Sequence, residues 1–410
     1  MSRRAIEYGC AIIVIGLLAG LAGVATTLLL HAVEHLTYHY TFGDLLAGVT
    51  DASPVRRALG PMIGGALAGL GWWALRRHTE IPTLTATIAS GRVRRLPLSI
   101  DAALQVLVVG SGASLGREGA PRQLAIAVGD LGTSRWSLTA RDREILLGCA
   151  AGAGLAAVYA VPVGGALFAV QIVLRSWHPR VVGTALITSS LAVTVASPVT
   201  HERTPLHWPD PQLSYFLAVA GVLLGVIAYA VGMGFNRLMD AARPATLIAS
   251  WTLVPAIACA GLLIGICSAW WPELPGNGKS ILTVTLNSGL TLGAAVTLLA
   301  LKPILTAVYL RAGAVGGMLT PSLATGAALG TAIALGVNTW TSASVNVPAV
   351  SLTCAAGVLA VTQRAPVWAA VFVWELARPP WWLFAPFLAA AAAAHALRLV
   401  HERRSRDRDG

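Results

Sequence analysis

Most of this chain is written twice, with the second copy following the first by about 200 residues. Four pairs of blocks carry the repeat: LTATIASG at 84–91 and LTVTLNSG at 282–289, GREGAP at 116–121 and GGMLTP at 316–321, CAAG at 149–152 and again at 354–357, and PVGGALFAVQ at 162–171 and PVWAAVFVWE at 366–375. The blocks keep their order and nearly their spacing, which indicates the duplication of half a protein. In a membrane chain, repeated halves usually enclose a transport path, so a site is expected where paired blocks meet.

The composition of the chain is that of a membrane protein. Hydrophobic residues make up 56% of the 410 residues and charged residues only 11%, too few to cover a soluble fold of this size. We therefore expect an all-α, multi-pass protein of the cell membrane. Its halves are expected at 8–199 and 213–400, joined by a polar, proline-rich linker at 200–212 and followed by a short basic tail at 401–410.

Apolar segments of two kinds are present. Those at 9–31, 213–234 and 251–271 are long enough to cross a hydrocarbon core, which takes roughly 20 helical residues. Segments at 81–91 and 317–330 are shorter or interrupted by glycine and threonine, so we expect them to enter the membrane as half-helices and stop at a buried cavity. Re-entrant half-helices at matching places in both halves are typical of transporters built from inverted repeats.

Basic residues outnumber acidic ones by 29 to 18, and nearly all of them are arginines at the ends of apolar segments. This pattern is typical of positive-inside anchoring, and no nucleic-acid motif accompanies it, so nucleic acid is not an expected partner. Both termini are expected in the cytoplasm. Termini on the same side require an even number of membrane crossings. Two equal halves give an even total when each half crosses an odd number of times, and such halves are inverted with respect to each other.

Three of the repeat blocks are expected to begin helices. Pro82 marks the start of one short helix, the turn at 116–119 opens onto a second, and the turn at 316–317 opens onto a third. Where such starts converge near the middle of a membrane, their unpaired backbone N–H groups and positive dipole ends attract an anion. A site of this kind needs neither a cofactor nor a metal, and it releases its ion more easily than a pair of buried cations would.

Glu118 is the candidate gate. Its carboxylate is itself an anion at a helix start, so it can occupy the anion site when charged and leave when protonated, in response to pH and to competing anions. The alternative is a carboxylate that only stabilises its helix start or neutralises Arg117. The duplicated glycine-rich turn favours the gate, and Met318 occupies the equivalent position in the second half.

Five further residues are candidates for the anion site: Thr79, Arg117, Gly119, Met318 and Thr320. Thr79 and Thr320 place hydroxyl groups at helix starts, where they either donate to the ion or cap the helix as acceptors. Arg117 either adds positive potential at the pore mouth or anchors the chain at the interface. Glu80, beside Thr79, would repel an anion and is expected to point into solvent.

Glu375 and Gln171 occupy equivalent positions in the two halves, each at the end of an apolar segment. A proton carrier at Glu375 is one hypothesis, and a structural side chain that satisfies nearby backbone groups is the favoured one. The five cysteines lie in apolar runs without metal-ligand spacing, so we expect them to fill the core rather than to form disulfides or bind metal.

Together, these motifs resemble the CLC family of chloride channels and proton-coupled anion exchangers. The resemblance extends over nearly the whole chain through GSGASLGREGAPRQLA, AVPVGGALFAVQ, LKPILTAVYLRAGAVGGMLTPSLATGAALG and TQRAPVWAAVFVWE, which stand in family order. It implies a homodimer with one pore per subunit, inverted repeats and a gating glutamate at Glu118. It also implies that Thr79 replaces an ion-binding serine, and that Leu319 replaces a phenylalanine whose backbone amide contacts the ion.

Two departures from the family pattern concern proton coupling and the inner gate. Ile172 stands where the exchangers carry an inner proton-accepting glutamate, and no tyrosine follows Tyr309 to match the one that closes the inner gate in many members. Relatives that export fluoride also lack this glutamate, and they too alter the serine motif, which reads HTEIP at 78–82 here. The sequence is compatible with a channel and with a proton-coupled exchanger.

We expect the protein to transport chloride or a similar small anion through a pore gated by Glu118. A fluoride/proton exchanger of the same family is the alternative. A carrier of an organic anion would need a roomier cavity with several polar contacts, and intramembrane polar residues are few. An enzyme is not expected, because an intramembrane hydrolase would need a nucleophile with a buried histidine partner, and no motif pairs Ser111 or Ser114 with one.

Overall fold

The computed structural model describes residues 3–40, 43–134, 136–200 and 215–409. Within these ranges the chain forms helices and their connections, and its only strand-like pairing is an isolated backbone bridge between Gly116 and Gly317. The predicted all-α fold is therefore confirmed. The predicted linker at 200–212 lies, from residue 201 on, outside the described residues.

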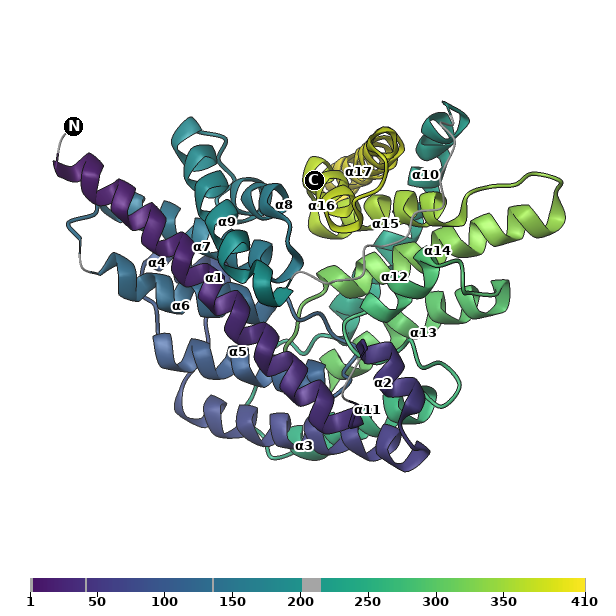
Figure 1. The fold of residues 1–410 in the computed structure, drawn as a ribbon, viewed down its shortest axis with the longest axis horizontal. Helices are drawn as coiled ribbons and strands as arrows, with labels where there is room; N and C mark the ends of the chain where they lie inside the picture. The colour runs from purple at the N-terminus through teal and green to yellow at the C-terminus, as the bar shows by residue number, and fades with distance from the viewer. Residues whose placement is uncertain (1–2, 41–42, 135, 201–214, 410) are drawn as a thin grey trace.

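The elements fall into two sets in chain order (Figure 1). The first set comprises α1 (Arg3–Tyr38), α2 (Leu45–Asp51), α3 (Pro54–His78), α4 (Leu84–Ser90), α5 (Arg95–Gly110), α6 (Gly119–Thr133), α7 (Ala140–Tyr159), α8 (Pro162–Leu167), the π-helical η1 (Phe168–Val173) and α9 (Pro179–Thr200). The second set comprises α10 (Tyr215–Ala242), α11 (Leu253–Cys267), α12 (Lys279–Leu286), α13 (Leu292–Arg311), α14 (Leu319–Trp340), α15 (Val347–Gln363), α16 (Pro366–Ala377), the 3₁₀ turn η2 (Trp381–Leu383) and α17 (Phe384–Asp409).

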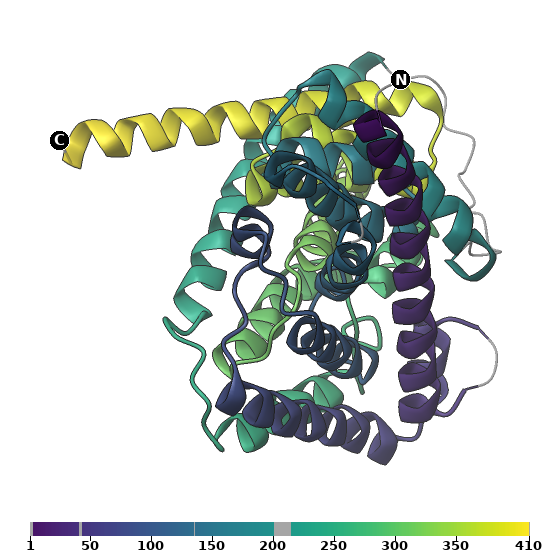
Figure 2. The same ribbon diagram turned by 90° about the vertical axis from the view of Figure 1, so that its left-hand side faces the viewer.

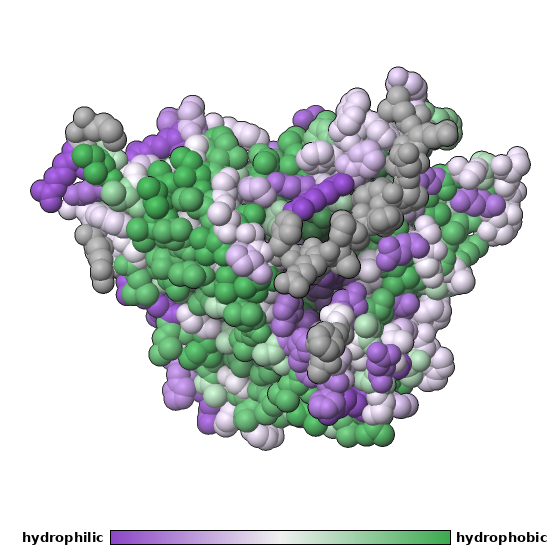
Figure 3. Space-filling view, in the orientation of Figure 1, coloured by the Kyte–Doolittle hydropathy of each residue, from purple (hydrophilic) through white to green (hydrophobic). Residues whose placement is uncertain are grey.

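The surface of the protein suits lipid. Seven helical stretches of the described residues are long and apolar enough to cross a membrane: α1, α3, α9, α10, α13, α14 and Trp381–Ser405. Large apolar side chains remain on their outer sides, as with Val219 and Leu223 of α10, which are 71% and 68% exposed. Figure 3 shows broad apolar areas over one face of the molecule. Such a surface is stable in hydrocarbon, so the predicted multi-pass membrane protein is confirmed.

Equivalent helices of the two halves meet each other. Helix α3 packs along α11, and α8 lies against α16, so each pair takes one helix from each half. In Figure 1 the α3 and α11 pair lies at the bottom of the view. The bridge between Gly116 and Gly317 joins the halves again, at the turns before α6 and α14. A site shared by the two repeats therefore lies on the boundary between them.

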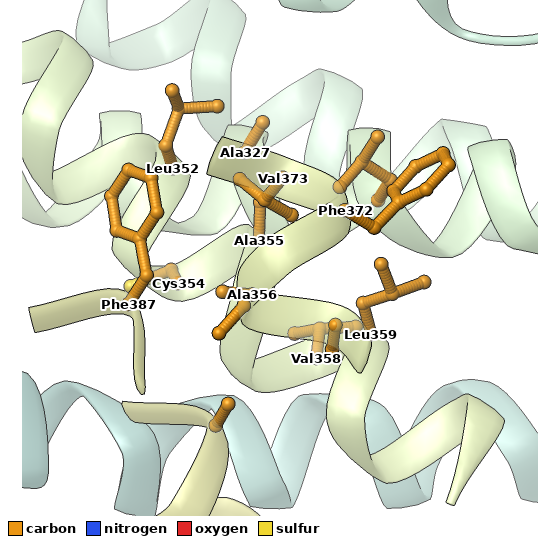
Figure 4. Close-up of a cluster of buried hydrophobic side chains, with 14 of the residues drawn as sticks. Ala327, Leu352, Cys354, Ala355, Ala356, Val358, Leu359, Phe372, Val373 and Phe387 are labelled. Carbon is orange, nitrogen blue, oxygen red and sulfur yellow. The ribbon is translucent and has the colours of Figure 1, made fainter. Parts of the chain in front are cut away.

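Small residues let α14 and α15 approach closely. Gly326 and Gly330 of α14 face the backbone of α15, where an added Cβ atom would overlap Ala355 or Ser351. Alanines, valines and aromatic side chains such as Phe372 fill the surrounding space (Figure 4). This packing keeps α14 buried along most of its length and fixes the place of its first residues.

Two of the predicted segment lengths are wrong. Residues 251–271 contain only the 15-residue α11, which is too short to cross a membrane by itself and packs against α3 instead. The predicted half-helix at 317–330 continues to Trp340 as the 22-residue α14, because its glycines pack against α15 and do not interrupt the helix. The half-helix expected at 81–91 is confirmed as α4, and α12 is its short counterpart in the second half.

The two ends of the described chain lie toward the same side of the molecule in Figures 1 and 2. Helix α17 continues through the predicted tail to Asp409 and projects away from the body in Figure 2. An ion pair between Arg398 and Glu402, one helical turn apart, lies where α17 becomes polar.

The five cysteines differ in exposure, and Cys267 of α11 is only partly buried. Cys149 and Cys354 are buried, as predicted, in α7 and α15. Cys10 of α1 and Cys259 of α11 are exposed, so the predicted core position is wrong for these two. The reason is that an apolar run in a membrane protein faces lipid as well as core, and hydropathy does not distinguish the two.

Candidate functional site

The two glycine-rich turns of the repeat are joined by backbone hydrogen bonds. The backbone nitrogen of Gly116 donates to the carbonyl oxygen of Gly317 at 2.7 Å, and that of Gly317 donates to the carbonyl oxygen of Gly116 at 2.8 Å. Helix α6 begins at Gly119 and α14 at Leu319, immediately after these turns. Two of the three predicted helix starts, one from each half, are therefore held next to each other.

The carboxylate of Glu118 lies on the first residues of α14. Its Oε1 atom accepts hydrogen bonds from the backbone nitrogens of Leu319, at 2.6 Å, and Thr320, at 3.3 Å, while its Oε2 atom accepts from the Thr320 hydroxyl at 3.0 Å. The side chain is fully buried, at 0% exposure. Glu118 thus precedes one helix, α6, and binds the start of the other, α14.

Glycine at positions 116 and 317 makes room for this arrangement. A Cβ atom on Gly116 would overlap both carboxylate oxygens of Glu118, and one on Gly317 would overlap its Cδ and Oε1 atoms. The carboxylate therefore fills a space that exists because both turns lack side chains. These two glycines, one in each repeat block, have a direct role in the site.

The contacts of Glu118 are those of an anion site. Unpaired backbone N–H groups at a helix start, together with the positive end of the helix dipole, bind negative charge without a full positive charge. Leu319 and Thr320 supply two such N–H groups, and the Thr320 hydroxyl adds a third donor. A buried carboxylate whose hydrogen bonds come from backbone N–H groups and a hydroxyl is a group that another anion can replace.

Arg117 and Arg122 place positive charge beside Glu118. Arg122, one turn along α6, donates from Nε to the backbone oxygen of Glu118 at 2.6 Å. Arg117 is partly buried, donates from Nη2 to the carbonyl oxygen of Val158 at 3.3 Å, and lies over the ring of Tyr159 at 5.3 Å from its centroid. These inward contacts favour a role in the potential of the site over interfacial anchoring, the two alternatives for Arg117.

Arg122 and Tyr159 are absent from the sequence-based site. Arg122 follows Glu118 by four residues, so a helix starting at Gly119 places it one turn away, and this spacing was a usable signal. Tyr159 ends α7 and reaches the site only through the fold. No motif in the sequence connects it with Glu118.

Thr79 lies elsewhere than at a helix start. It follows the last residue of α3, and the N-cap of α4 is Thr83, so the predicted place of Thr79 at a helix start is wrong, and so is the capping alternative. Its hydroxyl accepts a hydrogen bond from Arg94 Nη1 at 2.7 Å. Glu80 is exposed, as predicted. A contact between Thr79 and the transported ion stays a prediction.

Gly119 and Met318 stand at the first turns of α6 and α14. Met318 is the N-cap residue of α14, and its carbonyl oxygen accepts a hydrogen bond from the backbone nitrogen of Ser322 at 3.1 Å. The amide oxygen of Gln105 occupies the place where a side chain on Gly119 would lie. Direct binding of an anion by Gly119 or Met318 stays a prediction.

A buried carboxylate not used in the sequence-based site lies behind Gln105. Asp101 is 2% exposed and accepts hydrogen bonds from Trp72 Nε1, at 2.8 Å, and from the amides of Gln105 and Gln123, at 2.8 and 2.9 Å. With three donors, this carboxylate is well satisfied inside the protein. Its contacts order α5 against α3 and α6, next to the turn that carries Glu118.

Glu375 and Gln171 perform equivalent structural roles in the two halves. The Glu375 carboxylate accepts hydrogen bonds from the backbone nitrogens of Val163, at 3.0 Å, and Gly164, at 2.6 Å, at the start of α8. Gln171 accepts from the backbone nitrogen of Trp368, at 3.1 Å, at the start of α16. Each side chain thus satisfies the helix start of the other half, and the favoured structural interpretation of Glu375 is confirmed.

Metal ligands are not grouped in the described part of the chain. No set of three or more His, Cys, Asp or Glu side chains within it is arranged to hold a metal ion. The donors around Glu118 are N–H and O–H groups, which bind anions rather than cations.

Comparison with known proteins gives matches over nearly the whole chain. The sequence profile described as voltage gated chloride channel matches residues 72–398. The voltage-gated ClC-type chloride channel ClcB of Escherichia coli O139:H28 is 28% identical over 378 residues, covering 88% of this chain and 89% of the relative.

Solved structures match the fold at lower identity. A slow cyanobacterial Cl⁻/H⁺ antiporter has a TM-score of 0.76 at 19% identity, covering 95% of this chain and 93% of its own. A CLC-type fluoride/proton antiporter has a TM-score of 0.74 at 18% identity, covering 95% of each chain. Both confirm the predicted arrangement of helices.

Proposed function

The chain belongs to the voltage gated chloride channel family, and on that premise we propose that it moves chloride or a similar small anion across the membrane, with Glu118 as the gate. The observation that carries the proposal is the position of the Glu118 carboxylate on the donors that start α14. The name of the Escherichia coli relative, a chloride channel, supports chloride as the ion.

Competition between two negative groups explains how the gate works. The charged carboxylate of Glu118 occupies the N–H groups of Leu319 and Thr320, so an anion cannot bind them at the same time. Protonation removes the charge that the helix dipole attracts, and the side chain leaves. An anion then takes over the same donors and moves on, because neutral donors hold it weakly enough for release.

Flux through reconstituted protein tests this function. Liposomes loaded with potassium chloride should release chloride when the protein is present, and Glu118→Gln should keep or raise this release while abolishing its dependence on pH. Glu80→Gln removes an exposed carboxylate and should behave like the unchanged protein. Absence of chloride release in both the unchanged protein and Glu118→Gln would contradict anion transport by this chain.

A fluoride/proton exchanger is the second candidate. It is favoured by the altered motif HTEIP at 78–82, since relatives that export fluoride also alter this motif. The fold match with a CLC-type fluoride/proton antiporter is compatible with it but equally compatible with chloride. Fluoride release that exceeds chloride release under equal gradients would favour this candidate, and the opposite order would exclude it.

Proton coupling is tested separately from anion choice. We propose Glu118 as the proton-binding group, because its release requires a proton. If that proton enters from one side and leaves on the other during each cycle, a chloride gradient should drive proton movement against a pH gradient. Anion flux with no accompanying proton movement would indicate a channel.

We propose a homodimer in the cell membrane, with one pore in each subunit and both termini in the cytoplasm. The arginine clusters at segment ends and the shared side of the two chain ends support this orientation. Chemical cross-linking in membranes should give a dimer, and a protease added to the cytoplasmic side should remove an epitope placed after Asp409. An epitope cleaved only from the other side would contradict the orientation.

A further inference from the structure

Tyr159 carries a buried hydroxyl group beside the gate. The residue ends α7, its ring meets that of Phe372 edge-on with centroids 5.8 Å apart, and the guanidinium of Arg117 lies over its face. Its hydroxyl oxygen is shielded from solvent, and neither Thr320 nor Arg117, the two polar side chains within reach of it, meets it with hydrogen-bond geometry. Thr320 and Arg117 are polar neighbours of this oxygen, and Glu118 and Arg122 are charged neighbours of the side chain.

A hydroxyl in this position needs an explanation. Burying a polar group without a partner costs free energy, and phenylalanine would keep both ring contacts without that cost. The orphan atom is also a donor, because the phenol carries a proton. The Tyr159 hydroxyl is a donor next to an anion site that the Glu118 carboxylate occupies. This position indicates that its acceptor is the group that replaces the carboxylate.

The neighbouring contacts identify that acceptor. The Thr320 hydroxyl already donates to Glu118 Oε2, so Tyr159 lies next to the same carboxylate position without being bound to it. A halide ion that replaces the carboxylate is a sphere larger than one carboxylate oxygen and accepts hydrogen bonds from every direction. It therefore comes within reach of donors around the site that a carboxylate oxygen does not use.

We propose that the Tyr159 hydroxyl donates a hydrogen bond to the transported anion when that anion replaces the Glu118 carboxylate at the start of α14. This proposal rests on the proposed anion transport. It adds a side-chain donor from α7 of the first half to the backbone and hydroxyl donors of α14 of the second half. The anion is then bound from both repeats, as expected of a site on their boundary.

Anion binding measured without the competing carboxylate tests the role of Tyr159. In purified Glu118→Gln protein, calorimetric titration with potassium chloride gives the dissociation constant of the open site. Adding Tyr159→Phe removes one oxygen atom and keeps the ring, so the protein should remain folded, as checked by gel filtration and thermal unfolding. We expect chloride binding to weaken about tenfold, as for the loss of a hydrogen bond to a charged group.

The control is a phenol of the same kind outside the site. Tyr309 of α13 is 1% exposed, and its hydroxyl also completes no hydrogen bond with a described residue. In the Glu118→Gln background, Tyr309→Phe should change chloride binding by less than a factor of about two. Comparing the two Tyr→Phe changes separates the effect of a hydroxyl beside the anion site from the general effect of removing a buried hydroxyl.

A second readout requires no substitution at Tyr159. In Glu118→Gln protein labelled with 3-fluorotyrosine, at least one of the resonances of the seven tyrosines should shift with the chloride isotherm. When Tyr159→Phe is introduced, the protein should lose more affinity for anions that accept strong hydrogen bonds than for thiocyanate, which accepts weak ones.

The following results would overturn the proposal. Equal chloride binding with tyrosine and phenylalanine at position 159, or tyrosine resonances that ignore chloride, would show that the hydroxyl does not contact the anion. A change confined to the pH profile, with chloride binding unaltered, would assign the hydroxyl to the released Glu118 side chain and equally contradict this proposal. Failure of Glu118→Gln to bind any anion would contradict both this inference and the proposed transport.

Discussion

The Oε1 atom of Glu118 lies 2.6 Å from the backbone nitrogen of Leu319, although the two residues belong to opposite halves of a duplicated chain. The contact explains why the repeats diverge at this position. Glu118 supplies the negative group in one half, and the helix start at Leu319 supplies its donors in the other. Met318, the sequence equivalent of Glu118, caps the helix that receives the carboxylate.

Acidification should open the pore. The charged form of Glu118 occupies the donors of α14, so each bound proton releases the site, and anion flux should rise as pH falls. A gate controlled by one proton changes its open fraction by at most about tenfold per pH unit. Chloride release from liposomes at a series of external pH values measures this slope, and a flat profile in the unchanged protein would contradict the gate.

A methyl group at position 317 should displace the gate. Gly317→Ala places a Cβ atom in the space of the Glu118 carboxylate, and this flexible side chain can move away more easily than the backbone. We expect chloride release at neutral pH to rise toward that of Glu118→Gln and to lose its pH dependence. Gly234→Ala is the control, because a Cβ atom there meets nothing within 4 Å. Unaltered pH dependence in Gly317→Ala would show that the carboxylate lies elsewhere.

Loss of the Thr320 hydroxyl should shift the pH profile. Thr320→Val removes a donor to the charged form of Glu118 and keeps the backbone N–H group. Because this hydrogen bond favours the charged carboxylate on α14, its loss should let the side chain leave more easily, and the pore should open at higher pH. Thr325→Val, on the same helix, removes a hydroxyl that only bonds Pro321 and should leave the midpoint unchanged. A shift toward lower pH would contradict the direction of this interaction.

Glu375 should matter for stability rather than for gating. Glu375→Ala leaves the backbone nitrogens of Val163 and Gly164 without acceptors, which should lower the free energy of unfolding by about 2–3 kcal/mol. Thermal unfolding in detergent measures the loss, and the pH profile of chloride release should stay the same. Glu144→Ala removes only a partly exposed ion pair with Arg141 and should change stability by less than about 1 kcal/mol. Unchanged stability combined with altered proton movement would make Glu375 a proton carrier.

Thr79→Ala should alter selectivity among halides. The hydroxyl accepts a hydrogen bond from Arg94, so its loss both removes a donor and frees a cation near the connection between α3 and α4. Relative release of chloride, bromide and iodide measures the effect. Thr339→Ala removes an exposed hydroxyl that bonds only Leu335 and serves as the control. Identical halide ratios in Thr79→Ala and the unchanged protein would place this hydroxyl outside the pore.

The repeat made the centre of the site predictable from the sequence. Glycine-rich turns that open onto helices indicate where unpaired N–H groups lie, and duplication indicates that the two turns meet. Glu118 and Thr320 followed from these two arguments, and Leu319 followed from the resemblance to the CLC family. The predicted structural role of Glu375 followed in the same way, because Gln171 stands at its equivalent position.

The remaining contacts depend on tertiary packing. Tyr159 comes to the site because α7 ends beside α14, and no local pattern encodes that approach. The extent of α14 was also hidden, because glycine interrupts an isolated helix but permits close packing when a neighbour such as α15 covers it. Thr79 was placed at a helix start because Pro82 marks a start, but the helix begins after Thr83 instead.

The most direct test of the account is the position of a bromide ion in crystals of the Glu118→Gln protein. Anomalous scattering should place bromide within hydrogen-bond distance of the backbone nitrogens of Leu319 and Thr320, where the carboxylate lies when residue 118 is glutamate. In crystals of the unchanged protein grown at neutral pH, the same position should hold the carboxylate and no bromide. Bromide bound away from α14, or bromide and the Glu118 carboxylate bound side by side at full occupancy, would contradict competition for one site.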